Sequence, residues 1–121
     1  GGRIWEELPT PPWAPRRAHQ AVAVEDKLMI IGGAGVEDRR LRDCWESHDG
    51  GRSWQELPCP KWTARHSHQA IVLSVTTSLL HPRDCVVVCG GNAHGDKALR
   101  DVWLSDNGGF SWKEMETPPW P

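Results

Sequence analysis

The residues SHDGGRSW at positions 47–54 recur 58 positions later as SDNGGFSW at positions 105–112. Asp or Asn side chains accept hydrogen bonds from the backbone of their own turn, and glycine adopts the positive φ angles that tight turns between strands require. The two stretches therefore predict two equivalent turns, each followed by a short strand. We expect structural roles for the positions that recur in both copies, which are Asp49, Gly51, Trp54, Asn107, Gly109 and Trp112.

The repetition extends in both directions from these turns. Alignment of the chain with itself gives a unit of 49 residues, and the second copy reaches 58 residues through an insertion at about 75–84. Periods of this length are typical of propeller blades. The aligned pairs include Trp5 with Trp54, Trp13 with Trp62, Arg16 with Arg65, His19 with His68, Gly32-Gly33 with Gly90-Gly91, and Trp45 with Trp103.

Short strands are expected throughout each unit. In the first unit the alternation of apolar residues and the turn residues between them predict strands at 18–24, 27–31, 43–47 and 53–57. Gly32-Gly33 is expected to end the second strand, as Gly90-Gly91 is in the second unit. No window shows sustained helical spacing, and Pro and Gly interrupt every long one. The sequence predicts an all-β fold of four-stranded antiparallel meanders.

Two short motifs in each unit resemble known propeller repeats. The spacing Arg16-x-x-His19, followed by Gly32-Gly33, Trp45 and Trp54, resembles the kelch repeat, and the 47–54 turn resembles the Asp-box of sialidase-type propellers. The resemblance covers nearly the whole chain, although Asn107 stands where Asp49 stands in the first copy. It implies a β-propeller, of which this chain forms two blades plus flanking strands.

The repeat register divides the chain into four parts. Residues 1–17 are expected to be the outer strand of a preceding blade and its connecting loop, and 18–57 to be a blade with the Asp-box turn. Residues 58–112 are expected to be a second blade with the insertion, and 113–121 to begin the next connection. Because propellers contain four to eight blades, we expect the remaining blades to come from a longer chain or from other subunits.

Composition narrows the function. The 121 residues carry a net charge of −2, which argues against the basic field of a nucleic-acid-binding protein, and no apolar run is long enough to span a membrane. The chain has 8 Trp and no Tyr, so it cannot contain the tyrosine nucleophile of a sialidase. We expect no catalytic residues, no cofactor and no metal site. His66-x-His68 has a spacing that suits zinc, but no third ligand lies nearby in sequence.

The loops that precede the first strand and follow the second strand of each blade should share one rim of a propeller. Kelch-like domains generally bind partners on this rim, and Trp and Arg are enriched in binding hot spots. For Arg16 and Arg65, repetition also favours a structural role within each blade, as it does for His19 and His68. The candidate partner-binding residues are Trp13, Arg16, Arg17, Arg39, Arg40, Arg42, Trp62, Arg65, His94 and Lys97.

Four cysteines occupy positions that do not recur between the copies. Cys85 and Cys89 lie four apart on one expected strand, about 13 Å at about 3.3 Å per residue, which is too far for a disulfide. Unpaired thiols favour a reducing, intracellular compartment. The function expected from the sequence is a non-catalytic, kelch-like scaffold for protein interactions within a larger assembly. The alternatives are a carbohydrate-binding or sialidase-like propeller, and an assembly or stability factor of an organellar complex.

Overall fold

The computed structural model describes residues 4–75 and 83–116, and these residues form an all-β structure. Within them the chain has ten strands and two single 3₁₀ turns, η1 (Val36–Asp38) and η2 (His94–Asp96), and no α-helix. The all-β prediction is therefore confirmed. The predicted insertion lies largely outside the described residues, as do 1–3 and 117–121.

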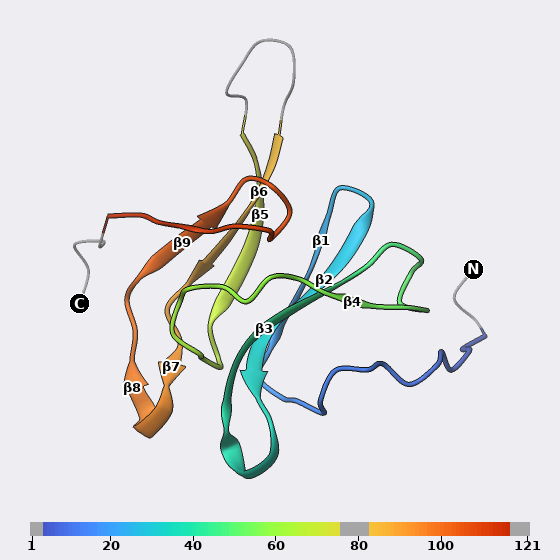
Figure 1. Cartoon of the computed structure of the whole chain (residues 1–121), viewed down its shortest axis with the longest axis horizontal. Coiled ribbons are helices and arrows are strands. Elements are labelled where there is room, and N and C mark those ends of the chain that lie inside the picture. Colours follow the sequence, from blue (N-terminus) through green and yellow to red (C-terminus); the bar gives the residue numbers. More distant parts are fainter. Residues whose placement is uncertain (1–3, 76–82, 117–121) are drawn as a thin grey trace.

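Two four-stranded antiparallel sheets make up most of the fold (Figure 1). Sheet 1 contains β1 (Gln20–Val24), β2 (Lys27–Ala34), β3 (Arg40–Ser47) and β4 (Gln55–Glu56). Sheet 2 contains β5 (Gln69–Val75), β6 (Arg83–Cys89), β9 (Val102–Ser105) and β10 (Lys113–Glu114), and a small separate ladder joins β7 (Asn92–Ala93) to β8 (Lys97–Ala98). In sheet 1 every strand pairs with its neighbour in sequence, as the predicted meander requires. In sheet 2 the strands also keep chain order, but the β7–β8 hairpin lies in sequence between the paired strands β6 and β9.

The strands of the two sheets pair at corresponding positions. Trp45 on β3 lies opposite Ile30 on β2, and Trp103 on β9 lies opposite Val88 on β6. These pairs correspond to one another in the sequence alignment, with the same offset of 58 residues on both strands. The register within each sheet thus follows the sequence repeat.

The Gly-Gly pairs behave differently in the two sheets. The prediction that the second strand ends at Gly32-Gly33 is wrong, because β2 continues to Ala34 through a register shift between Ile31 and Gly33. The positive φ angles of 60° and 111° at these glycines accommodate this bulge. In sheet 2 the prediction is confirmed, since β6 ends at Cys89 and the chain continues into the short β7.

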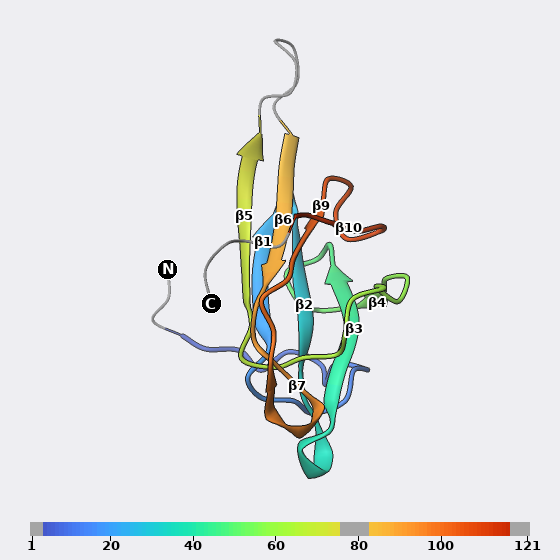
Figure 2. The ribbon, with the colours of Figure 1, turned by 90° about the vertical axis from the view of Figure 1, so that its left-hand side faces the viewer.

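The core lies between the two sheets, whose strands β1, β2, β5 and β6 run side by side (Figure 2). One side of each sheet contributes to it, together with the segment that connects them. Burying each large apolar side chain contributes roughly 1.5–3 kcal/mol. The buried residues of the core are Val24, Met29, Ile31 and Cys44 from sheet 1, Ala70, Val86 and Val88 from sheet 2, and Leu57 and Trp62 from the connecting segment.

The turns that precede β4 and β10 share one hydrogen-bond pattern. The Ser47 hydroxyl accepts a bond from the Gly51 N–H at 2.9 Å and donates to Asp49 at 2.9 Å, and Asp49 accepts a bond from the Ser53 N–H at 2.8 Å. In the second turn the Asn107 carbonyl oxygen replaces the carboxylate and accepts bonds from the Ser105 hydroxyl and the Ser111 N–H. An amide oxygen therefore supports this turn as a carboxylate does.

Candidate partner-binding groove

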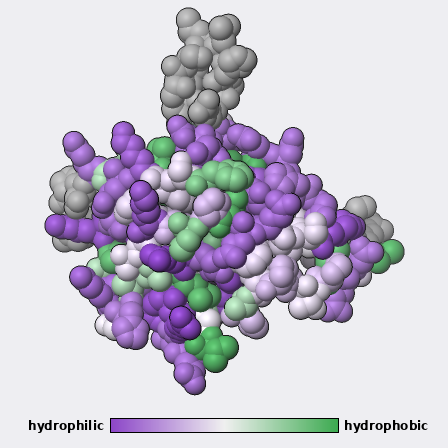
Figure 3. Space-filling model, viewed as in Figure 1, coloured by the Kyte–Doolittle hydropathy of each residue, from purple (hydrophilic) through white to green (hydrophobic). Residues whose placement is uncertain are grey.

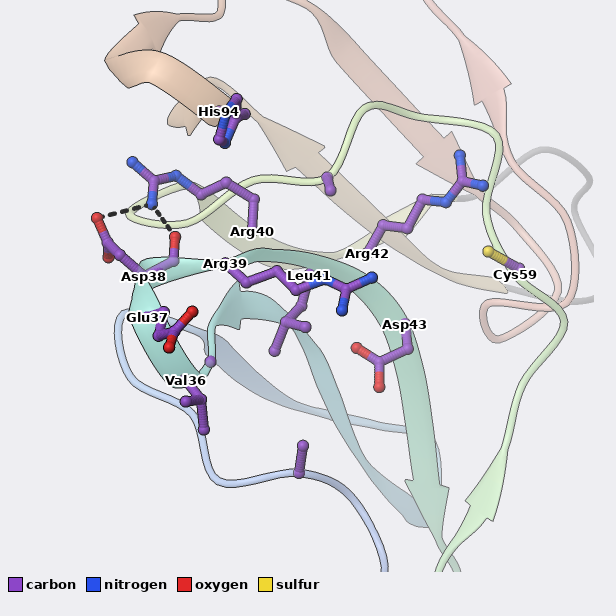
Figure 4. A pocket seen from close by; sticks show the side chains of 13 residues that line it. Val36, Glu37, Asp38, Arg39, Arg40, Leu41, Arg42, Asp43, Cys59 and His94 are labelled. Carbon is purple, nitrogen blue, oxygen red and sulfur yellow. Dashed lines mark hydrogen bonds and ion pairs between the residues drawn. The ribbon is translucent and has the colours of Figure 1, made fainter.

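The β2–β3 loop and the β7–β8 hairpin lie at the same end of the molecule (Figure 1). A groove lies between them. It has a volume of about 880 Å³. The β2–β3 loop and the start of β3 form most of its wall, and Ala14, Cys59, Ala64 and His94 complete it (Figure 4). The groove is therefore lined by the segment between the sheets and by loops of both sheets. These loops form the rim on which the sequence predicts partner binding.

Arg40 fixes the shape of this groove. Its side chain is 5% exposed, and its guanidinium donates to the Asp38 carbonyl oxygen at 2.6 Å and to the Asp96 carboxylate at 2.9 Å. Asp38 belongs to the β2–β3 loop of sheet 1 and Asp96 to the β7–β8 hairpin between β6 and β9 of sheet 2, so Arg40 ties the two loops together. The hydrogen bond from Arg40 also lowers the pKa of Asp38. Arg40 is thus held by its own neighbours.

Arg39 and Arg42 line the groove with exposed guanidinium groups. Both residues are exposed, and neither side chain forms a hydrogen bond or ion pair with any residue in the described ranges. Figure 4 shows Arg42 extending toward Cys59, whereas Arg40 turns the other way, toward Asp38 and His94. Because guanidinium groups bind carboxylates and carbonyl oxygens with several donors, Arg39 and Arg42 are able to bind polar groups of a partner.

Arg16 and Arg65 are enclosed and are not accessible from the groove. Both side chains are 0% exposed, and each guanidinium binds one carboxylate through two hydrogen bonds, Arg16 with Asp43 and Arg65 with Asp101. Burial raises the pKa of both carboxyls, but the arginine and tryptophan hydrogen bonds outweigh it and leave each pKa below its usual value. Each arginine also donates to a glycine carbonyl oxygen of its own sheet. The two ion pairs serve the fold.

Trp13 and Trp62 are likewise engaged within the structure. Trp62 is fully buried and meets Trp112 edge to face at 6.0 Å, and Trp13 meets Trp54 in the same geometry at 5.7 Å. The guanidinium of Arg65 lies 5.4 Å from the Trp62 ring centre. The Trp62 indole fills space in the core between the sheets, whereas the half-buried Trp13 indole packs on Trp54 outside that core. Both rings leave little surface for a partner.

The remaining candidates lie at the surface. Arg17 is exposed and pairs with Asp38, while His94 lines the groove from η2 and Lys97 lies beside it on β8. The accessible candidates are therefore Arg17, Arg39, Arg42, His94 and Lys97, of which Arg39, Arg42 and His94 line the groove.

Two groove features were not singled out from the sequence. Asp96 aligns with Asp38 at the 58-residue offset, so the repeat itself could have indicated a second carboxylate at this position. Its contact with Arg40 depends on how the sheets are placed, which no local pattern encodes. Cys59 lines the groove as an exposed thiol, and no sequence signal distinguishes it from the other cysteines.

A second groove of about 700 Å³ lies beside the turns at the other end of the sheets. Here the Lys27 ammonium donates to Glu46 at 2.5 Å and to the Gly108 carbonyl oxygen at 2.7 Å. Lys27 and Glu46 belong to sheet 1 and are nearly buried, whereas Gly108 belongs to the turn before β10. This buried pair joins sheet 1 to the turn of sheet 2, which identifies it as a structural contact.

The cysteines are all unpaired, and burial raises the pKa of the Cys44 thiol. Within the described residues no group of three or more His, Cys, Asp or Glu side chains is arranged to hold a metal ion. No helix in that part of the chain is long and apolar enough to cross a membrane.

Comparison with known proteins gives no further assignment, since no protein-family model and no curated protein matches this chain. The site therefore has to be interpreted from its own geometry.

Proposed function

We propose that this chain forms two blades of a kelch-like β-propeller and that the groove beside the β2–β3 loop binds a protein partner without catalysing a reaction. The proposal is supported by the sequence repeat and by two four-stranded sheets of corresponding register. Further blades would come from a longer polypeptide or from other subunits.

The observation that carries the binding role is the contrast among the arginines of the groove. Arg40 is held on both sides by carboxylates, whereas Arg39 and Arg42 stay exposed in the same groove and their side chains have no partner among the described residues. A wall fixed by one arginine thus presents two others to a ligand. A groove of about 880 Å³ accepts an extended peptide segment or a loop of another protein.

The proposal is tested by affinity capture with three forms of the immobilised protein. We expect wild type and an Arg52→Glu control to retain the same partner, because Arg52 is an exposed residue on the turn before β4, outside the groove. The double variant Arg39→Glu/Arg42→Glu should lose it, at least tenfold in quantitative mass spectrometry. Equal retention by all three forms, or a loss with Arg52→Glu alone, would contradict binding in the groove.

A further inference from the structure

The contact between the two sheets joins two different faces. Strand residues alternate between the two sides of a sheet, so the core residues Val22 and Val24 place Ala21 and Ala23 on the other side of β1. Sheet 1 therefore meets sheet 2 with one side and leaves its other side uncovered by sheet 2. We call the uncovered side of sheet 1 the head face and that of sheet 2 the tail face. The exposed apolar residues of the head face are Ala21, Ala23 and Leu28, and those of the tail face are Ile71, Leu73 and Met115. Ile30 and Val87 lie on the same two faces but are only 7% and 9% exposed.

The tail face corresponds residue by residue to the side of sheet 1 that is buried in the core. Leu73 aligns with Val24, and Leu73 is 46% exposed whereas Val24 is 1% exposed. Met115 aligns with Leu57, and their exposures are 41% and 3%. The tail face thus has the chemistry of a covered side but has no sheet against it in the described structure.

The head face corresponds in the same way to the buried side of sheet 2. Leu28 aligns with Val86, and the two are 38% and 0% exposed. Ala21 is exposed, while its counterpart Ala70 is buried in the core. One chain therefore carries both halves of the contact that its own two sheets make. Figure 3 shows that on the view of Figure 1 hydrophobic side chains form small patches in a mostly hydrophilic surface.

Backbone groups repeat the same pattern. Between the sheets the Gly33 N–H donates to the Arg65 carbonyl oxygen at 2.9 Å, and the Arg65 N–H donates to the Leu41 carbonyl oxygen at 3.1 Å. The corresponding groups at the tail face are the Gly91 N–H and the Leu99 carbonyl oxygen, and neither is bonded to a described residue. The backbone N–H and carbonyl of Arg16 are the matching groups at the head face, and neither forms a backbone hydrogen bond to any other described residue.

We propose that the head face of one copy of this chain binds the tail face of a second copy, with the geometry by which sheet 1 meets sheet 2. Such a contact is heterologous, so it builds a ring when the rotation closes and an open chain of copies when it does not. The proposal rests on the same interpretation of the sheets as repeated modules as the proposed function, and it does not depend on partner binding in the groove.

Association requires that one side chain of the second copy replace Leu8 over Gly51. Gly109 is covered by Leu57, whose Cδ1 lies 3.0 Å from a Cβ built at that glycine, and Leu8 covers Gly51 in the same way at 3.3 Å. In a head-to-tail pair Met115 of the second copy occupies the position of Leu8. Ile4 and Trp5 are 90% and 92% exposed, and Glu6 makes a surface ion pair with Arg52 at 3.3 Å, so the segment before Leu8 is displaced at little cost.

The directional contact is tested with two face variants. Leu28→Asp places a charge on the head face only, and Leu73→Asp places one on the tail face only. Sedimentation equilibrium should show wild type rising above the 13.6 kDa of one chain with concentration, while each variant alone stays at 13.6 kDa. An equimolar mixture of the two should form a species of twice that mass and no larger one. In this mixture only the tail face of the Leu28→Asp variant and the head face of the Leu73→Asp variant are unaltered.

Matched controls separate a damaged fold from a lost contact. Val36→Asp adds the same charge at a position 74% exposed on η1, outside both faces, and should associate as wild type does. Where a face variant fails to fold by circular dichroism, Ala23→Glu and Ile71→Asp replace it, since both positions are exposed in the single chain. A Leu8→Ala variant should associate more tightly than wild type, because it removes the competitor of Met115.

Three results would overturn the proposal. They are a wild-type chain that stays at 13.6 kDa at all concentrations, association that survives both face variants, and a mixture of variants that forms no pair. None of these bears on capture of a partner by the groove, so this proposal and the proposed function fail separately.

Discussion

Arg65 donates two hydrogen bonds to the carboxylate of Asp101, at 2.7 and 2.8 Å, from a side chain with no exposed surface. Arg16 and Asp43 form the same pair in sheet 1 at 2.9 Å. Since removing one partner of a buried ion pair leaves the other charge without compensation, loss of either residue is expected to destabilise the fold strongly. Both pairs are expected to contribute little to recognition.

Replacement of Arg65 by methionine should lower the free energy of unfolding by about 3–5 kcal/mol, because Asp101 then stays partly buried without its partner. Urea unfolding followed by tryptophan fluorescence measures this. The control Arg17→Met removes an ion pair whose arginine side chain is 66% exposed and should cost less than about 1 kcal/mol. Equal losses in the two variants would contradict the structural role of Arg65.

Stability should fall on mild acidification because of His68. Burial, followed by the positive charge of Arg65, lowers the pKa of this fully buried imidazole to about 4. The unfolded chain binds its proton near the ordinary pKa of about 6.5, so acid favours unfolding. The stabilisation is complete above about pH 6.5 and is lost between there and about pH 4, by roughly 3 kcal/mol at most.

Unfolding measured at a series of pH values tests this, with His68→Gln and the exposed His48→Gln as the compared variants. We expect the slope between pH 6.5 and 4 to flatten with His68→Gln and to persist with His48→Gln. A slope unchanged in both variants would assign the acid sensitivity to other groups. The carboxyls of Asp43 and Asp101 affect stability at lower pH than His68 does, because their pKa values in the folded protein lie below the usual value of a carboxyl.

The turn before β4 should tolerate an amide but not an alanine. The hydrogen bond from the Ser53 hydroxyl and then that from its N–H hold the pKa of Asp49 at about 2. In the second turn the Asn107 side chain also accepts a hydrogen bond from the Ser111 N–H, and its amide nitrogen donates to the Ser111 hydroxyl. Asp49→Asn should therefore leave the melting temperature nearly unchanged above pH 4, whereas Asp49→Ala should lower it clearly. Equal losses would show that the negative charge itself is required.

Gly91 and Gly95 differ in what surrounds them. Both have positive φ, 91° and 76°, but a Cβ at Gly91 would lie 2.7 Å from the His66 carbonyl oxygen, and a Cβ at Gly95 would meet nothing within 4 Å. Gly95→Ala should cost about 1–2 kcal/mol from backbone strain alone. Gly91→Ala should cost clearly more in the same thermal unfolding measurement, because the backbone has to shift. A smaller loss at Gly91 would contradict the close packing of this strand end.

The sequence was informative where structure is local. The turns at Asp49 and Asn107 were predictable because their hydrogen bonds join residues two to four apart. The four-strand order of each sheet followed from alternation and turn residues. The continuation of β2 past Gly32-Gly33 was not predictable, because the bulge exists only through pairing with β3.

The site depended more on contacts between the sheets. Trp62 was interpreted as a contact residue because tryptophan is common in binding sites, yet its indole packs against Trp112 from the next sheet. Arg40 looked like any other arginine of its loop, although Asp96, 56 residues away, is its partner. The sequence predicts partner-binding loops on this rim, but the arrangement of the two sheets decides which arginine side chains stay without a partner there.

The central claim is that both sheets are copies of one module, each covered on its sides by further modules of the same kind. A crystal structure of the protein in its assembled state tests this most directly. We expect a four-stranded sheet against Leu28 and another against Leu73, in the relation that sheet 1 has to sheet 2. Solvent, a helix or an unrelated fold on either side would contradict the account.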